Sequence, residues 1–227
     1  MFYPFLANTP RHTMKPSREE QVAQLASKIA TILEEAIDHT ITSREDYFEQ
    51  HPDKRPSALD INKIIHSYAT QNFAIAGASN LIPGPLGMLA ALPELTLILR
   101  NQLQMIYDLS VAHNKQQDMN QYALLGIFAS AMGEGAVALA TIEGRNLLIK
   151  RASLKVVQKL LKWLGTRISQ KLLKHLIAKW VPVAGAVIMA TWSRQSTLDL
   201  GDRAEKMLRY DITFSQDDFD EDDIPRS

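Results

Sequence analysis

Apolar residues recur at helical spacing along most of this chain. The first run follows Ser17 and Glu20, whose spacing is that of a capping box, and it places Val22, Leu25 and Ile29 on one face. No stretch alternates convincingly between apolar and polar residues, so strands are not expected. The pattern predicts an all-α protein, a single bundle of about seven helices with an apolar hairpin at its centre. The expected helices cover about 18–36, 60–73, 86–113, 120–142, 145–164, 166–179 and 184–208.

Proline, serine and asparagine mark the expected ends of these helices. Ser43 is the expected start of a further short helix that ends before Pro52. The run from Pro83 to Pro85 forces a break, because proline removes a backbone donor and restricts the residue before it. Pro93 is expected to kink or restart the next helix, and Asn114 suits the C-terminal cap of that helix.

Three apolar stretches raise the question of a membrane: residues 73–99, 122–142 and 176–192. The first two reach the length of about twenty residues that a membrane-spanning helix needs. Each carries one carboxylate near its middle, Glu94 and Glu134, and a carboxylate is costly in lipid unless it meets a partner or water. Burial inside a helical domain and embedding in a membrane both stay open. We expect Glu94 and Glu134 to be largely buried and each to have a hydrogen-bonding partner.

Composition restricts the chemistry and the compartment. The chain has 227 residues, 25 of them basic and 25 acidic, and it has no cysteine, which excludes disulfides, thiolate nucleophiles and cysteine-based zinc sites. The N-terminus lacks the features of a signal peptide, so we expect a cytoplasmic protein, peripheral on the inner face of the cell membrane or partly inserted in it. The expected organisation is an N-terminal helical extension (1–56), a main helical domain (57–210) and a disordered acidic tail (211–227).

Charge is unevenly distributed along the chain. From Gly144 to Lys179 there are ten lysines or arginines and no aspartate or glutamate, and most of them fall on one side of two expected amphipathic helices. Such a face suits an anionic lipid surface, but a bundle helix can also simply solvate its lysines, and the acidic tail could fold back over the basic residues until a partner displaces it. Nucleic acid is disfavoured, because no aromatic stacking platform or DNA-binding motif accompanies the charge. The basic face comprises Arg151, Lys155, Lys159, Lys162, Arg167, Lys171 and Lys174.

Few side chains could carry reaction chemistry. They are His66, His113, Asp108, Glu94 and Glu134. The chain contains no spacing typical of a metal-binding bundle, a zinc protease, a nucleophile elbow or a phosphate-binding loop. His113 is expected to cap the carbonyl end of its helix, and Glu94 to accept free backbone donors in a first turn. The sequence therefore predicts a protein that is not an enzyme and needs no metal or cofactor.

Two motifs resemble those of the EcsC protein family. LIPGPLGMLAALPELTLILRNQLQMIYDLSVAHNK (residues 81–115) is similar to the family's Pro-Gly break, apolar helix, Pro-Glu step and Gln-x-x-Met-Ile pattern, and to the YcjF-type helical domain behind some bacterial GTPases. VPVAGAVIMATWSRQSTLDLGDRAEKML (181–208) resembles the C-terminal helices of the family. Asn114 stands where relatives often have glycine, and the second motif keeps only Gly185 of a run that is usually richer in glycine. The resemblance is carried by Pro83, Gly84, Pro93, Gln102, Met105, Pro182 and Gly185.

This resemblance covers about residues 60–208. It implies an all-helical bacterial module, often linked to the membrane or to membrane machinery, with no established catalytic residues. The leading hypothesis is a non-enzymatic module that associates with an anionic membrane surface or with a membrane protein, such as a transporter or a GTPase. The alternative is a soluble helical protein that binds another protein, as an adaptor or regulator. An enzyme that uses Glu94 or Glu134 is a remote third hypothesis.

Overall fold

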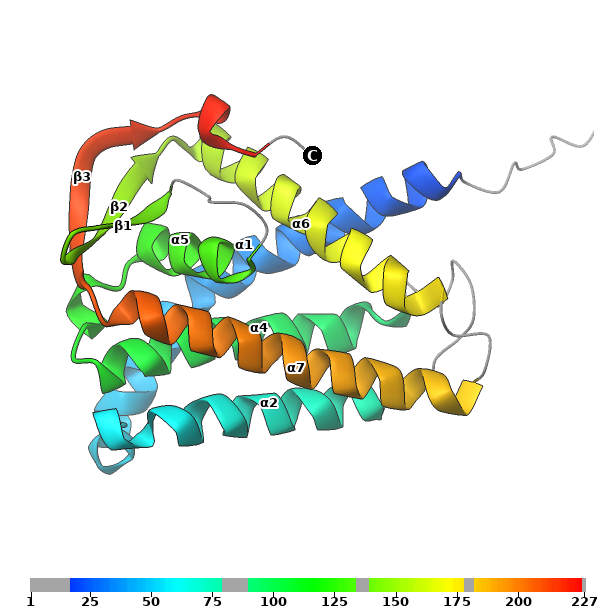
Figure 1. The fold of residues 1–227 in the computed structure, drawn as a ribbon, viewed down its shortest axis with the longest axis horizontal. Coiled ribbons are helices and arrows are strands. Elements are labelled where there is room, and N and C mark those ends of the chain that lie inside the picture. Colours follow the sequence, from blue (N-terminus) through cyan, green and yellow to red (C-terminus); the bar gives the residue numbers. More distant parts are fainter. Residues whose placement is uncertain (1–16, 79–89, 134–138, 178–181, 226–227) are drawn as a thin grey trace, which may run out of the picture.

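The computed structural model describes residues 17–78, 90–133, 139–177 and 182–225. Within these ranges the fold is mostly helical, which confirms the expected fold class, and it adds a small sheet (Figure 1). The helices are α1 (Arg18–Gln50), α2 (Ile61–Gly77), α4 (Leu92–Ala112), α5 (Gln121–Ala131), α6 (Leu154–Ile177) and α7 (Pro182–Leu208). The strands are β1 (Ala140–Glu143), β2 (Asn146–Ala152) and β3 (Asp211–Phe219). Short 3-10 turns cover Pro52–Lys54, Ala58–Asp60, Gln116–Asp118 and Glu221–Asp223.

The first helix is longer than expected. Its capping box is confirmed: Ser17 Oγ accepts a hydrogen bond from the Glu20 amide (3.2 Å), and the Ser17 amide donates to the Glu20 carboxylate (2.7 Å). The separate helix expected from Ser43 is wrong, because α1 continues through this position to Gln50. Ser43 Oγ donates to the Thr40 carbonyl (3.2 Å), so its hydroxyl is satisfied inside the helix and does not cap a new one.

One hydrophobic core joins the N-terminal helix to the rest of the protein. Helix α1 packs against α6 and α4, while α2 packs along α7 and α4. Ile29 and Leu33 of α1 are buried in the same cluster as Leu103 and Ile106 of α4. Residues 18–50 are therefore a layer of the fold itself and not an extension outside it. Among the described residues, no helix has the length and apolar character needed to cross a bilayer.

Helix α4 has the ends that the sequence predicts. It begins at Leu92, with Pro93 in its first turn, which corresponds to a restart at this proline. At its other end Asn114 adopts a φ of 58°, its amide donates to the Val111 carbonyl (2.9 Å), and the Lys115 amide donates to the Ser110 carbonyl (2.8 Å). These two bonds form a Schellman motif, so the predicted Asn114 cap is confirmed. The prolines and glycine of the preceding break lie outside the described residues.

The sheet contradicts the expectation of no strands. Strands β1 and β2 form an antiparallel hairpin that turns at Gly144, whose φ is 60°, and β3 pairs with β2 in parallel. Helix α5 ends at Ala131 and α6 begins at Leu154, so the helices expected over about 120–142 and from about 145 are both wrong in their bounds. Leu147 and Ile149 of β2 are fully buried, and the pairing between β2 and β3 then shifts between Ile149 and Arg151. That irregularity interrupts the alternation by which a strand is normally detected.

The acidic tail is ordered up to residue 225, against the expectation of disorder. Residues 211–219 form β3, and Phe219 at its end has only 1% of its surface exposed. Ile224 packs against the core as well. The tail was expected to be disordered because it has few aliphatic residues, but two apolar side chains and a row of backbone hydrogen bonds to β2 are sufficient to hold it.

Candidate functional site

Three lysines form an exposed row on α6. Lys155, Lys159 and Lys162 are spaced by four and three residues, so they project from one side of the helix, and all three side chains face solvent. No aspartate or glutamate occurs anywhere in α6. We call these three residues the lysine row. It is the part of the predicted basic face that the structure brings together.

The other predicted basic residues lie elsewhere. Arg151 is exposed on β2 and not on a helix. Arg167 lies over the Trp163 ring, with 5.4 Å between its Cζ and the ring centroid, and Lys171 Nζ donates to the Met132 carbonyl (3.2 Å). The side chain of Lys174 lies outside the described residues.

The reason for this division is that α6 does not break near Gly165. At about 100° per residue in one continuous helix, Arg167 and Lys171 are turned by roughly 120° and 160° away from Lys155. A Cβ on Gly165 would lie 2.2 Å from the Ala26 carbonyl oxygen, so this glycine is the point where α1 and α6 touch. The expectation of two helices with one shared basic face is therefore wrong.

The acidic end of the chain lies across the lysine row. Glu221 forms ion pairs with Lys155 (3.1 Å) and Lys159, and Asp223 forms one with Lys150 of β2 (3.7 Å). The hydrogen bond from Lys159, and then that from Lys155, hold the pKa of the Glu221 carboxyl below its ordinary value. Lys162 has no ion pair with a described carboxylate. The fold-back of the tail over the basic residues, one of the readings left open by the sequence, is thus present in the structure.

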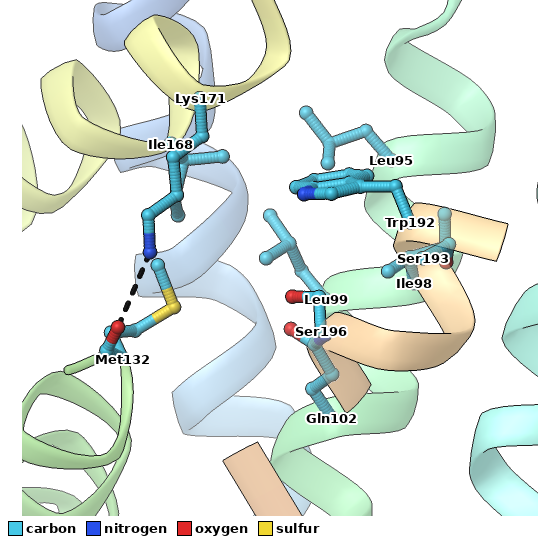
Figure 2. A pocket seen from close by; sticks show the side chains of 10 residues that line it. All are labelled: Leu95, Ile98, Leu99, Gln102, Met132, Ile168, Lys171, Trp192, Ser193 and Ser196. Atoms are coloured by element: carbon cyan, nitrogen blue, oxygen red, sulfur yellow. Dashed lines mark hydrogen bonds between the residues drawn. The ribbon is translucent and has the colours of Figure 1, made fainter. Parts of the chain in front are cut away.

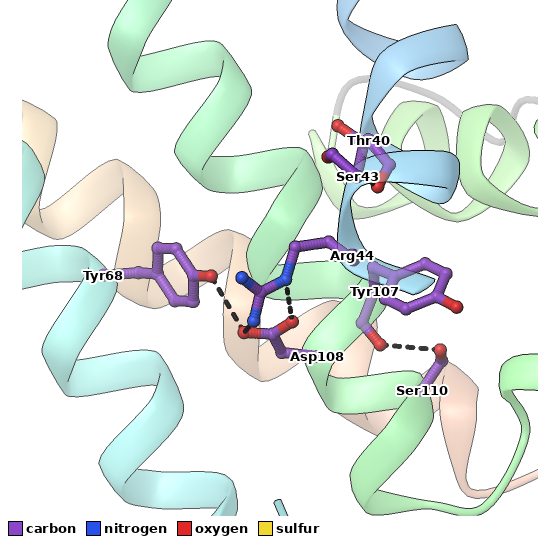
Figure 3. A network of polar contacts seen from close by, with 7 residues as sticks. All are labelled: Thr40, Ser43, Arg44, Tyr68, Tyr107, Asp108 and Ser110. Atoms are coloured by element: carbon purple, nitrogen blue, oxygen red, sulfur yellow. Dashed lines mark hydrogen bonds and ion pairs between the residues drawn. The ribbon is translucent and has the colours of Figure 1, made fainter. Parts of the chain in front are cut away.

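A buried ionic network holds α1, α2 and α4 together (Figure 3). The Arg44 guanidinium donates two hydrogen bonds to the Asp108 carboxylate, both 2.8 Å long, and Tyr68 Oη donates a third of 2.8 Å. The Arg44 Cζ also lies 4.5 Å from the Tyr47 ring centroid. Burial raises the pKa of Asp108, and burial together with the nearby Asp108 raises the pKa of Tyr68, so the tyrosine stays a proton donor. Every strong polar group of this network is satisfied, which indicates a structural role.

A second buried network involves a residue of the family motif. Asn72 of α2 donates to Thr197 Oγ1 (2.9 Å) and accepts from Asn101 Nδ2 (2.8 Å), while Gln102 Nε2 donates to the same Thr197 hydroxyl (3.2 Å). Met105, the next motif residue, is fully buried one turn further along α4.

The remaining residues of the family motif lie at helix ends or outside the described ranges. Pro93 lies in the first turn of α4 and Pro182 in the first turn of α7, and Gly185 lies within α7. Pro83 and Gly84 lie outside the described residues.

Two candidates for chemistry, Glu94 and His113, lie apart at opposite ends of α4. Glu94 is in the first turn of α4, as expected, but it is only half-buried, and its Oε2 has no hydrogen-bond partner among the described residues. The expected partner is thus not found for this oxygen among the described residues. Glu134 lies outside the described residues. His113 is the C-cap residue of α4, with Nε2 at 3.7 Å from Glu205 Oε1, and burial lowers its pKa.

A small pocket between α4, α6 and α7 gives no ligand site (Figure 2). Leu95, Leu99 and Trp192 are among the residues that line it, and Lys171 crosses one side toward Met132. The space holds little more than a water molecule. His66 is exposed on α2, and no group of acidic or histidine side chains in the described ranges could hold a metal ion.

Comparison with known proteins adds no assignment. No protein-family model, no curated protein and no solved structure matches this chain. The resemblance to the EcsC family stays a prediction.

Proposed function

We propose that this protein is a non-enzymatic, EcsC-like helical module that binds the anionic face of the cytoplasmic membrane through the lysine row. The observation that supports the proposal is the row itself: three exposed ammonium groups on one side of a helix that has no acidic residue. Each lysine close to an anionic lipid surface contributes about 1 kcal/mol of binding free energy. Leu154, at the start of α6, is 69% exposed and could enter the headgroup region beside them.

Exposed apolar side chains at one end of the bundle are a second feature that suits a membrane. Phe73 of α2, Leu97 of α4, and Val187 and Ile188 of α7 are large and at least one third exposed. The C-terminal end of α2 and the N-terminal ends of α4 and α7 lie at the same end of the long axis (Figure 1). Exposed apolar groups gathered in one region favour contact with lipid or with another protein.

The alternative function is binding of an acidic protein segment by the same lysines. One observation favours it: Lys155 and Lys159 already hold a carboxylate of an acidic polypeptide, the end of this same chain. The two functions differ in the source of the anion, and the following experiment separates them.

We expect that replacing the lysine row, Lys155→Gln with Lys159→Gln and Lys162→Gln, weakens binding to vesicles of phosphatidylcholine and phosphatidylglycerol by about ten- to a hundred-fold. Each lost charge accounts for about 1 kcal/mol of binding free energy. The total is smaller than three such contributions, because the acidic tail already pairs with two of the lysines. Co-sedimentation with vesicles measures the effect. The melting temperature should hardly change, because exposed lysines contribute little to folding.

The matched control replaces Lys28, Lys63 and Lys206 with glutamine. These residues are exposed on α1, α2 and α7, so the net charge changes equally while the lysine row stays intact. Equal loss of binding in both triple variants would show that only overall charge matters. Absence of vesicle binding by the native protein, together with binding of poly-glutamate that needs the lysine row, would favour the alternative function.

A further inference from the structure

We infer that the acidic turn, defined as residues 220–223, is an intramolecular cover that competes with the anionic ligand for the lysine row. The inference rests on the proposed function for the nature of that ligand. Figure 1 shows the end of the chain passing β3 and then lying beside the first turns of α6. Its carboxylates reach Lys155 and Lys159 of the row and Lys150 next to it.

The contacts are those of a ligand bound to a site. Glu221 uses both carboxylate oxygens, Oε1 for Lys155 and Oε2 for Lys159, and so bridges two successive turns of α6. Asp223 adds Lys150 from the neighbouring strand. A lipid phosphate would need the same ammonium groups, because these are the donors that the surface offers. The turn and a membrane therefore cannot occupy Lys155 and Lys159 at once.

The acidic turn is weakly held, whereas the strand before it is firmly held. Strand β3 pairs with β2 over most of its length and ends at Phe219, which is buried in the core. Beyond Phe219 the two ion pairs with the lysine row are open to water: 77% of the Lys155 side chain, 47% of Lys159 and 39% of Glu221 are exposed. The third pair is less open, with 25% of Lys150 and 33% of Asp223 exposed. Exposed pairs are screened by salt and are individually weak. Ile224, half-buried against the core, adds a modest apolar hold.

It follows that only the residues after Phe219 move away from the lysine row when the cover opens. The strand keeps its place, and the short acidic segment leaves the lysines when a surface with many negative charges approaches. The apparent affinity for that surface equals the intrinsic affinity multiplied by the fraction of molecules in which the lysines are uncovered.

Removing the two paired carboxylates tests the cover. In the full chain, Glu221→Gln with Asp223→Asn should strengthen binding to phosphatidylglycerol vesicles by roughly three- to thirty-fold, since two exposed ion pairs and one partly exposed pair no longer compete. The matched control is Asp217→Asn with Asp222→Asn. It removes the same charge, one carboxylate from β3 and one from the acidic turn, but neither residue pairs with a described lysine or arginine, so we expect little change. An equal gain in both variants would show a general charge effect and would overturn the cover.

A second measurement follows the position of the acidic turn directly. The chain has no cysteine, so Asp222→Cys gives one site for a spin label on the exposed side of the acidic turn. We expect the label to become mobile at high salt and on addition of phosphatidylglycerol vesicles, and to be mobile from the start when Glu221→Gln and Asp223→Asn are combined with it. A label equally immobile in all three conditions overturns the inference. Mobility that responds to salt, without any binding of vesicles, would support the cover and refute the membrane proposal.

Discussion

We expect Asp108→Ala to lower the free energy of unfolding by about 3–5 kcal/mol, the range for breaking a buried ion pair by removing one partner. The substitution leaves the Arg44 guanidinium without the carboxylate that accepts two of its hydrogen bonds, in a place where its side chain is only 16% exposed. Tyr68 Oη loses its acceptor at the same time. Urea unfolding followed by circular dichroism would measure the loss.

Two further variants separate the charge from its surroundings. Tyr68→Phe removes one hydrogen bond to a charged acceptor and should cost about 1.5–3 kcal/mol. Burial raises the pKa of Asp108 despite the nearby Arg44, which indicates that desolvation of the carboxylate outweighs its attraction to the guanidinium. Because of that balance, the apolar pair Arg44→Met with Asp108→Leu should recover the part of the stability that Asp108→Ala loses through the unpaired guanidinium, while Tyr68 Oη still lacks its acceptor. A double variant no more stable than Asp108→Ala would contradict this account.

The raised pKa of Asp108 also determines how the stability of the protein depends on pH. A carboxyl whose pKa is raised in the folded state binds its proton more tightly there than in the unfolded chain. Its contribution to stability is therefore full below the unfolded pKa and is lost as pH rises through the folded pKa. The opposite holds for Glu221, whose lowered pKa makes its ion pairs effective above its ordinary pKa and weak as pH falls through the lowered value.

Local signals predicted two helix ends correctly, the start of α1 and the end of α4. The capping box of Ser17 and Glu20 and the left-handed Asn114 are both fixed by residues within a few positions of each other. A helix cap depends only on the backbone donors and acceptors of one short segment. All residues that form it are therefore neighbours in the sequence. The same is true of the lysine row, whose spacing alone places its three members on one side of α6.

Long-range contacts explain what the sequence did not reveal. Strand β3 has mostly exposed side chains, so it carries almost no hydrophobic pattern, and its place depends on pairing with β2, more than sixty residues earlier. Glu221 lies sixty-two residues from Lys159, so only the folded chain shows that they meet. Glycine is a poor helix former, so the sequence predicts a helix break near Gly165, but the residue that decides its role, Ala26, belongs to another helix.

Gly165→Ala should destabilise the protein by about 3 kcal/mol, at the upper end of the usual cost of adding a methyl group to a packed contact. The new Cβ would lie 2.2 Å from the Ala26 carbonyl oxygen and 3.0 Å from the carbonyl carbon, and these are backbone atoms that no rotamer change can move. Helices α1 and α6 would have to separate, which loosens the packing of Leu25 and Leu161 in the shared core. Urea unfolding measures the change.

Gly77→Ala is the matched control, since Gly77 is also helical and gains the same methyl group. Its nearest neighbour would be the Ala190 Cβ at 3.6 Å, an ordinary contact. In the absence of a clash, the better helix propensity of alanine should leave stability unchanged or raise it by up to about 1 kcal/mol. The two substitutions are thus expected to act in opposite directions. If Gly165→Ala were as harmless as Gly77→Ala, close contact between α1 and α6 could not be the reason for a glycine in the middle of α6.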